Sequence, residues 1–97
     1  MKYERINRSS QIDISVNTIV EYTAVLQSDR TSAGNRAVAY TNRGMAYAGK
    51  EDYDRAIADF NEAIRIDPNY AVAYSNRGNL FEAKGRREEA IADKPEP

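Results

Sequence analysis

The segments AVAYTNRG (residues 37–44) and AVAYSNRG (residues 71–78) differ at one of eight positions and begin 34 residues apart. The same offset relates a second pair of segments, because AIAD occurs at residues 56–59 and again at residues 90–93. Two matching blocks in one register indicate an internal repeat. A fixed period of this length is typical of stacked repeat architectures, in which each unit packs against its neighbours.

Each repeat has the residue spacing of two consecutive helices. Within residues 37–48, tyrosine, glycine and alanine recur at the spacing of one buried helical stripe. Residues 49–51 interrupt this pattern, and residues 56–64 resume it with alanine, isoleucine and phenylalanine. Pro68 ends the second helix, because proline lacks an amide proton and disfavours helix at the preceding residue. One repeat is therefore expected to form an antiparallel helical hairpin.

Short polar and small residues mark the expected ends and crossings of these helices. We expect Asn35, Asp52 and Asn69 to act as N-caps, because their side-chain oxygens accept hydrogen bonds from free backbone N–H groups. Gly44 and Gly78 are expected where helices cross, because a residue without a side chain lets two backbones approach closely. Large aromatic residues beside these glycines then fill the remaining space.

Residues 37–70 resemble one tetratricopeptide repeat, and residues 71–93 resemble a second repeat that stops early. The matching positions in the first repeat are Tyr40, Gly44, Tyr47, Ala56, Phe60, Ala63 and Pro68. The second repeat matches at Tyr74, Gly78, Phe81 and Ala90. Two positions depart from the family pattern: Glu51 replaces the usual turn glycine, and Lys94 replaces a large aromatic residue. The resemblance implies an all-α fold, a short right-handed solenoid of antiparallel helical hairpins.

Upstream of the repeats, residues 17–27 can be aligned with the second helix of a preceding repeat. In this alignment Thr18, Tyr22 and Val25 take the positions of Ala56, Phe60 and Ala63, and the connector that follows is four residues longer than the family spacing. A strand is the alternative, because Ile12, Ile14 and Val16 alternate. We expect a helix from about residue 15 to residue 27, because a lone strand has no pairing partner.

These assignments divide the chain into three parts. Residues 1–14 are expected to form a flexible N-terminal tail, residues 15–93 the helical repeat domain, and residues 94–97 a C-terminal tail. With 97 residues, the chain corresponds to one small domain with a modest core.

Composition excludes several classes of function. The chain has no cysteine and no histidine, which removes thiolate nucleophiles, imidazole bases and the usual zinc ligands. We therefore expect no catalysis, no metal and no cofactor. The net charge of −1 disfavours nucleic acid, and no apolar run is long enough to span a membrane. Because no secretory signal is visible either, we expect a cytoplasmic location.

One stretch resembles a phosphate-binding loop. Residues 44–50 read GMAYAGK and fit the first seven positions of that motif. The eighth position must be serine or threonine to hold Mg²⁺, and here it is Glu51. The motif also follows a strand, whereas these residues belong to an expected helix. We therefore expect no nucleotide site and interpret the glycines as packing positions.

The resemblance implies that the first helices of the repeats line a concave groove that binds extended or helical peptides. The residues expected to line it are Thr41, Asn42, Met45, Ser75, Asn76, Asn79 and Glu82. Asparagine amides donate and accept hydrogen bonds at once, which suits a peptide backbone. One branch of the family binds a C-terminal carboxylate with lysine and asparagine, but threonine, serine and valine replace those lysines here. Alternatively, the pairs Asn42-Arg43 and Asn76-Arg77 only bond neighbouring helices.

Two functions remain open. The first is a protein-protein interaction module that binds a peptide or protein in its groove. The second is a self-assembly element, in which exposed faces of the last repeat form a homodimer or higher oligomer. The residues expected at such a contact are Leu80, Phe81 and Ile91, because an incomplete terminal repeat leaves apolar surface that tends to find a partner.

Overall fold

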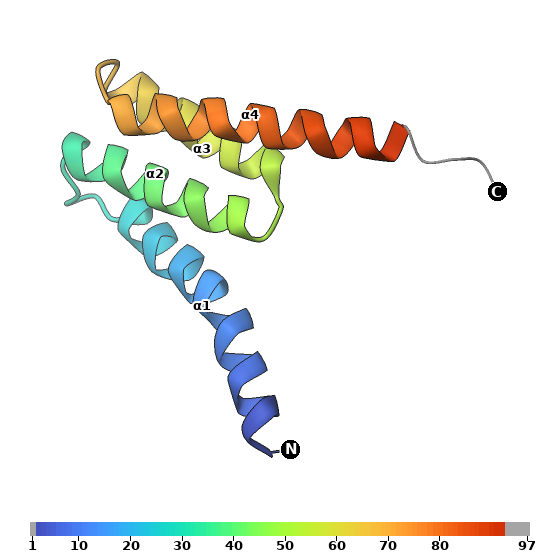
Figure 1. Cartoon of the computed structure of the whole chain (residues 1–97). Coiled ribbons are helices and arrows are strands. Elements are labelled where there is room, and N and C mark those ends of the chain that lie inside the picture. The colour runs from blue at the N-terminus through green and yellow to red at the C-terminus, as the bar shows by residue number, and fades with distance from the viewer. Residues whose placement is uncertain (1, 93–97) are drawn as a thin grey trace.

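The computed structural model describes the backbone of residues 2–92 and the side chains of residues 14–88. Four helices follow one another: α1 (Lys2–Gln27), α2 (Ala33–Gly49), α3 (Tyr53–Ile66) and α4 (Ala71–Ala92). No strand occurs between residues 2 and 92. α2 and α3 form an antiparallel hairpin, with α1 packed on one side and α4 on the other (Figure 1). The expected all-α helical repeat fold is confirmed.

The hairpin of α2 and α3 is the complete repeat. Its turn contains Glu51, whose φ of 62° lies in the left-handed region, where the family pattern has glycine. The carboxylate of Asp52 then caps α3 by accepting a hydrogen bond from the N–H of Arg55, as predicted. At the other end, α3 stops at Ile66, two residues before Pro68. The predicted bounds of this helix are therefore correct.

The start of α2 differs from the prediction. Ser32, not Asn35, is the N-cap, and its hydroxyl accepts a hydrogen bond from the N–H of Asn35 at 3.3 Å. A hydroxyl three residues upstream satisfies that N–H first, so Ala33 and Gly34 join the helix. The prediction that Asn69 is an N-cap is wrong as well, because α4 begins at Ala71 and Asn69 lies in the turn before it, where its N–H donates to the carboxylate of Asp67.

The core lies where α3 contacts both α2 and α4. Ala56, Phe60 and Leu80 form its buried centre, and Tyr47 and Ile57 pack around them. Phe60 is the largest fully buried side chain among those described. Among the described side chains, α2, α3 and α4 contribute to this cluster and α1 does not, so the stability of the core depends on three helices being present together.

α1 is longer than predicted, because it begins at Lys2 rather than at about residue 15. Residues 2–14 contain neither proline nor glycine, so nothing in the local sequence ends the helix there. The alternation of Ile12, Ile14 and Val16 therefore does not mark a strand. Only the C-terminal half of α1 lies against α2, and its N-terminal half extends away from the other helices (Figure 1).

α4 runs as one continuous helix through the point where the first repeat turns back. Arg86 stands in it at the position that Asp52 occupies in the first repeat, and a guanidinium cannot accept the hydrogen bond of an N-cap. Gly78 was predicted at a helix crossing, and that prediction is wrong: nothing lies within 4 Å of a Cβ built on it. No helix returns to cover this side of α4 within residues 2–92. The expected tail at residues 94–97 lies outside the described residues.

Candidate functional site

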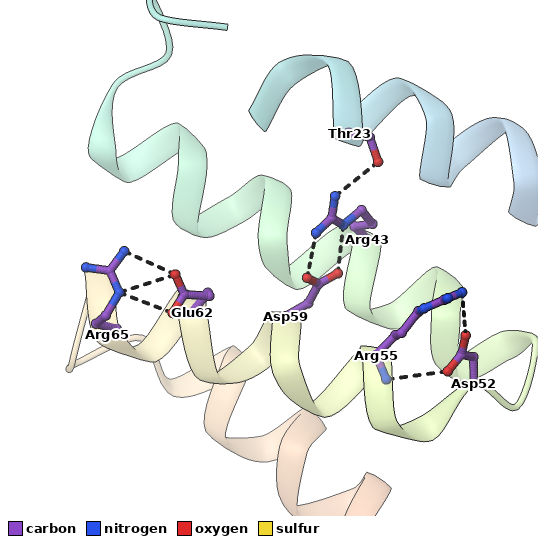
Figure 2. Close-up of polar contacts among 7 residues, drawn as sticks. All are labelled: Thr23, Arg43, Asp52, Arg55, Asp59, Glu62 and Arg65. Atoms are coloured by element: carbon purple, nitrogen blue, oxygen red, sulfur yellow. Dashed lines mark hydrogen bonds and ion pairs between the residues drawn. The ribbon is translucent and has the colours of Figure 1, made fainter. Parts of the chain in front are cut away.

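Arg43 on α2 joins three helices. Its Nε and Nη2 donate to the carboxylate of Asp59 on α3, both at 2.8 Å, and its Nη1 donates to the hydroxyl of Thr23 on α1 at 3.0 Å (Figure 2). The hydrogen bond with Asp59 raises the pKa of the Arg43 guanidinium above its usual value. The cation also lies 5.7 Å from the ring centroids of both Tyr40 and Tyr47. This arrangement supports the interpretation that the repeated Asn-Arg pair connects helices.

The equivalent residue of the next repeat makes an equivalent contact. Arg77 on α4 donates from Nη1 to the side-chain oxygen of Asn61 on α3 at 2.8 Å. Asn61 occupies on α3 the position that Thr23 occupies on α1 when Phe60 is aligned with Tyr22. α1 therefore packs on α2 in the way that α3 packs on α4, and it is positioned as the second helix of a preceding repeat.

A groove of about 360 Å³ opens between the C-terminal half of α2 and the middle of α4. Its lining residues are Met45 and Ala48 of α2, Tyr53 and Phe60 of α3, and Asn76, Asn79, Leu80 and Ala83 of α4. The buried ring of Phe60 and the side chain of Leu80 supply its apolar inner wall. The two asparagines supply hydrogen-bonding amides on one side, and Met45, half exposed, lies on the other.

Three of the residues that the sequence places in a groove line this one together: Met45, Asn76 and Asn79. Thr41 does not, because it is only 1% exposed and its hydroxyl donates to the carbonyl of Ala37. Asn42 lies in a separate hollow beside α1, where its amide donates to the hydroxyl of Tyr22 at 3.1 Å.

The remaining two expected groove residues lie on α4 but outside the groove lining. Ser75 is exposed. Glu82 is exposed as well, and its carboxylate forms an ion pair with Arg86 one helical turn further along. An i, i+4 pair of this kind stabilises the helix itself. Only Met45, Asn76 and Asn79 of the seven expected residues therefore line this groove, and their role in binding stays a prediction.

Sequence reasoning did not place Tyr53, Phe60, Leu80 and Ala83 in the groove. Phe60 and Leu80 were expected elsewhere, Phe60 in the core and Leu80 at an oligomer contact. Leu80 is 5% exposed and packs against Phe60, so it is not available at the surface. Phe81, the next residue, is 52% exposed. The side chain of Ile91, also expected at that contact, lies outside the described residues.

A smaller hollow of about 260 Å³ lies between the start of α3 and the end of α4, and its charges pair with one another. Lys84 donates to the carboxylate of Asp54 at 3.0 Å, and this hydrogen bond raises the pKa of the lysine above its usual value. Arg87 donates to the backbone carbonyl of Glu51. These contacts hold α4 against the turn of the first repeat, so we interpret this hollow as structural.

The described residues contain neither a metal-binding cluster nor a membrane-spanning helix. No group of three or more acidic side chains there could hold a metal ion. No described helix is long and apolar enough to cross a membrane. Gly44 and Gly49 both lie inside α2, so the stretch that resembles a phosphate-binding loop is helical rather than a loop after a strand.

Comparison with known proteins identifies the repeats. A sequence model described as a tetratricopeptide repeat matches residues 37–70, and a second model with the same description matches residues 60–92. The first match coincides with the hairpin of α2 and α3 and the turn that follows it. The second spans the C-terminal half of α3 and all of α4. No curated protein and no solved structure matches the chain.

Proposed function

The chain belongs to the tetratricopeptide repeat family, and on this basis we propose that it binds a peptide segment of another protein in the groove between α2 and α4. Tetratricopeptide repeats in general mediate protein–protein interaction, and the family is in general a non-catalytic scaffold. The observation that carries the proposal is the groove itself, which has an apolar wall and two asparagine amides within one 360 Å³ space.

The chemistry of the groove favours one class of ligand. None of its eight lining residues carries a charge. An aliphatic side chain of the ligand can bury itself against the partly exposed side chains of Met45, Ala48 and Ala83, which gains about 25 cal/mol for each Å² of apolar surface removed from water. The amides of Asn76 and Asn79 can then accept from and donate to the ligand's backbone. We therefore propose an internal, extended segment with one aliphatic anchor residue as the ligand.

A terminal carboxylate is a poorer ligand for this groove. Binding of a free carboxylate gains most from a cation, because charge-assisted hydrogen bonds are about twice as strong as neutral ones. The groove offers only amides, and the nearby polar residue Thr41 is buried and already donates to Ala37. A peptide and its C-terminally amidated form should therefore bind with similar affinity.

The experiment that tests the proposal is selection of peptides from a random display library on the immobilised chain, followed by measurement of their affinity for two variants. Ala83→Arg places a long side chain in the groove. Ala58→Arg places the same side chain on the exposed side of α3, outside the groove lining. Both positions are helical and both changes add one charge, so they form a matched pair.

Selected peptides should share an aliphatic residue, and Ala83→Arg should weaken their binding at least about tenfold, the equivalent of 1.4 kcal/mol. Ala58→Arg should leave the affinity unchanged. Peptides that bind both variants equally would show that the groove is not the binding surface.

A second function, assembly of the chain with itself, is favoured by a separate observation. The side of α4 that carries Tyr74, Gly78 and Phe81 is exposed, whereas the equivalent side of α2 is covered by α3. Exposed apolar surface of this kind is a common contact between protein chains.

A further inference from the structure

The four helices alternate between two kinds. α2 and α4 are equivalent, because residues 37–44 and 71–78 repeat one another. α1 and α3, the second-type helices, are equivalent as well, because they pack on α2 and α4 through Arg43–Thr23 and Arg77–Asn61. Only α2 has a second-type helix on both sides, namely α1 and α3. Within the described residues, α4 has one such neighbour, α3, and nothing covers its other side.

The open side of α4 is a stripe of three residues, Tyr74, Gly78 and Phe81. Tyr74 is 43% exposed and Phe81 is 52% exposed. The equivalent glycine of α2, Gly44, lies under the ring of Phe60, and a Cβ built on it would be 2.8 Å from that ring. A Cβ built on Gly78 meets nothing within 4 Å. The stripe therefore has the shape that receives a second-type helix, and no helix between residues 2 and 92 covers it.

Arg77 beside this stripe has only part of the contacts that Arg43 makes. Arg43 binds Thr23 of the preceding helix and the carboxylate of Asp59 of the following one. Arg77 binds Asn61 of its preceding helix, and its guanidinium lies 5.4 Å from the ring centroid of Tyr74. A carboxylate on a helix that covers the stripe would give Arg77 the ion pair that Arg43 has with Asp59.

The outer side of α1 carries the complementary residues. Glu21 occupies on α1 the position of Asp59, and Val25 the position of Ala63. Glu21 is exposed and Val25 is 37% exposed, whereas Asp59 and Ala63 are both buried against their neighbours. Tyr22, which occupies the position of Phe60, lies between this side and the side that contacts α2.

We propose that α1 of a second copy of the chain packs on the stripe of α4 and completes a repeat between two chains. In this junction Glu21 of the second copy binds Arg77, as Asp59 binds Arg43. Tyr22 of the second copy packs over Gly78, as Phe60 packs over Gly44. The junction reuses the geometry of the α2–α3 hairpin. The two charged side chains that meet in it, Arg77 and Glu21 of the second copy, have opposite charges.

The two surfaces of the junction are different, so the contact is heterologous. Each copy carries one stripe on α4 and one outer side of α1, and it can therefore bind a further copy through each of them. Association of this kind continues with concentration unless the chains close into a ring. The proposal involves the opposite side of α4 from Leu80, so the peptide groove remains open in the assembly.

The mass in solution of the 97-residue chain, measured by sedimentation over a wide concentration range, tests the proposal. Gly78→Leu is the first variant, because it fills the space that the second copy's Tyr22 needs and its Cβ has no described atom within 4 Å. Arg77→Glu and Glu21→Arg are a charge-reversal pair. Each alone places like charges at the junction, and a mixture of the two restores opposite charges at both junctions that it can form. Thermal unfolding followed by circular dichroism checks that each variant is folded.

The average mass of the unaltered chain should rise with concentration to at least twice that of the monomer. Gly78→Leu, Arg77→Glu and Glu21→Arg should each weaken association about tenfold or more, and mixing the two charge variants should restore it. A chain that stays monomeric throughout overturns the proposal. So does an assembly that survives Gly78→Leu, or a mixture that associates no better than its components. Peptide binding in the groove is measured separately and is unaffected by either result.

Discussion

The ring of Phe60 lies against Gly44 so closely that a Cβ on this glycine would be 2.8 Å from the Cε1 atom of the ring. This contact joins α2 and α3 at the centre of the repeat. Phe60 is 1% exposed and is held by Ala56 and Leu80 as well, so its ring has little room to move away. The repeat therefore requires a residue without a side chain at position 44.

Substitution of the two equivalent glycines should have opposite effects. Gly44→Ala overpacks the contact with Phe60 and should lower the free energy of unfolding by about 1–3 kcal/mol. Gly78→Ala adds a methyl group to open space inside a helix and should raise it by about 0.5–1 kcal/mol. Urea unfolding at low protein concentration measures both changes. Equal effects at the two positions would contradict this account of the crossing.

The two phenylalanines should also differ in their contribution to stability. Phe60→Ala removes the largest buried side chain and should lower the free energy of unfolding by about 3–5 kcal/mol, enough to unfold most of so small a domain. Phe81→Ala removes a side chain that is already half exposed, so it should change stability much less. Circular dichroism at 222 nm distinguishes the two. Loss of helix in the Phe81 variant at low concentration would be inconsistent with this core.

Glu51 should be replaceable by glycine with a gain in stability. Its φ of 62° places Cβ close to the following carbonyl oxygen, and glycine removes that contact. Glu51→Gly should raise the free energy of unfolding by about 0.5–1 kcal/mol. Lys50→Gly is the control, because φ of Lys50 is −91° and glycine there only adds freedom to the unfolded chain. A gain at position 50 and none at position 51 would be the opposite of the expected result.

The ion pairs of Figure 2 should differ in strength. Arg43 and Asp59 pair through two hydrogen bonds, with side chains 19% and 7% exposed, whereas the side chains of Arg65 and Glu62 are 67% and 42% exposed. A double-mutant cycle should give a coupling energy of about 1–3 kcal/mol for the first pair. The second should give at most about 0.5 kcal/mol. Similar values for both pairs would contradict the joining role of Arg43.

Much of the fold could be predicted from sequence because the chain contains two copies of one segment, which can be aligned with each other. The 34-residue offset between residues 37–44 and 71–78 fixed the hairpin, its turn and the position of Gly44. The alignment of Tyr22 with Phe60 placed α1 correctly, although the connector is four residues longer. In both cases residue type and spacing agree, and packing between the helices follows from them.

The errors came from treating the second repeat as a copy of the first. Gly78 matches Gly44 in sequence, but a crossing needs a second helix, and α4 continues where α2 stops. The cap at Asp52 has no counterpart, because Arg86 cannot accept a hydrogen bond. The groove was predicted from one side only: the resemblance to the tetratricopeptide repeat implied Met45 and the asparagines, whereas the inner wall depends on how three helices pack together.

The most direct test of the central claim is the change in the ¹H–¹⁵N spectrum of the chain when a selected peptide is added. This account predicts that the side-chain amides of Asn76 and Asn79 and the backbone amides of Ala48 and Ala83 shift together with one dissociation constant. The amide of Ala58, on the other side of α3, should not move. Shifts confined to α1 or to the outer side of α3, with both asparagine side chains unchanged, would contradict the claim that this groove binds the partner.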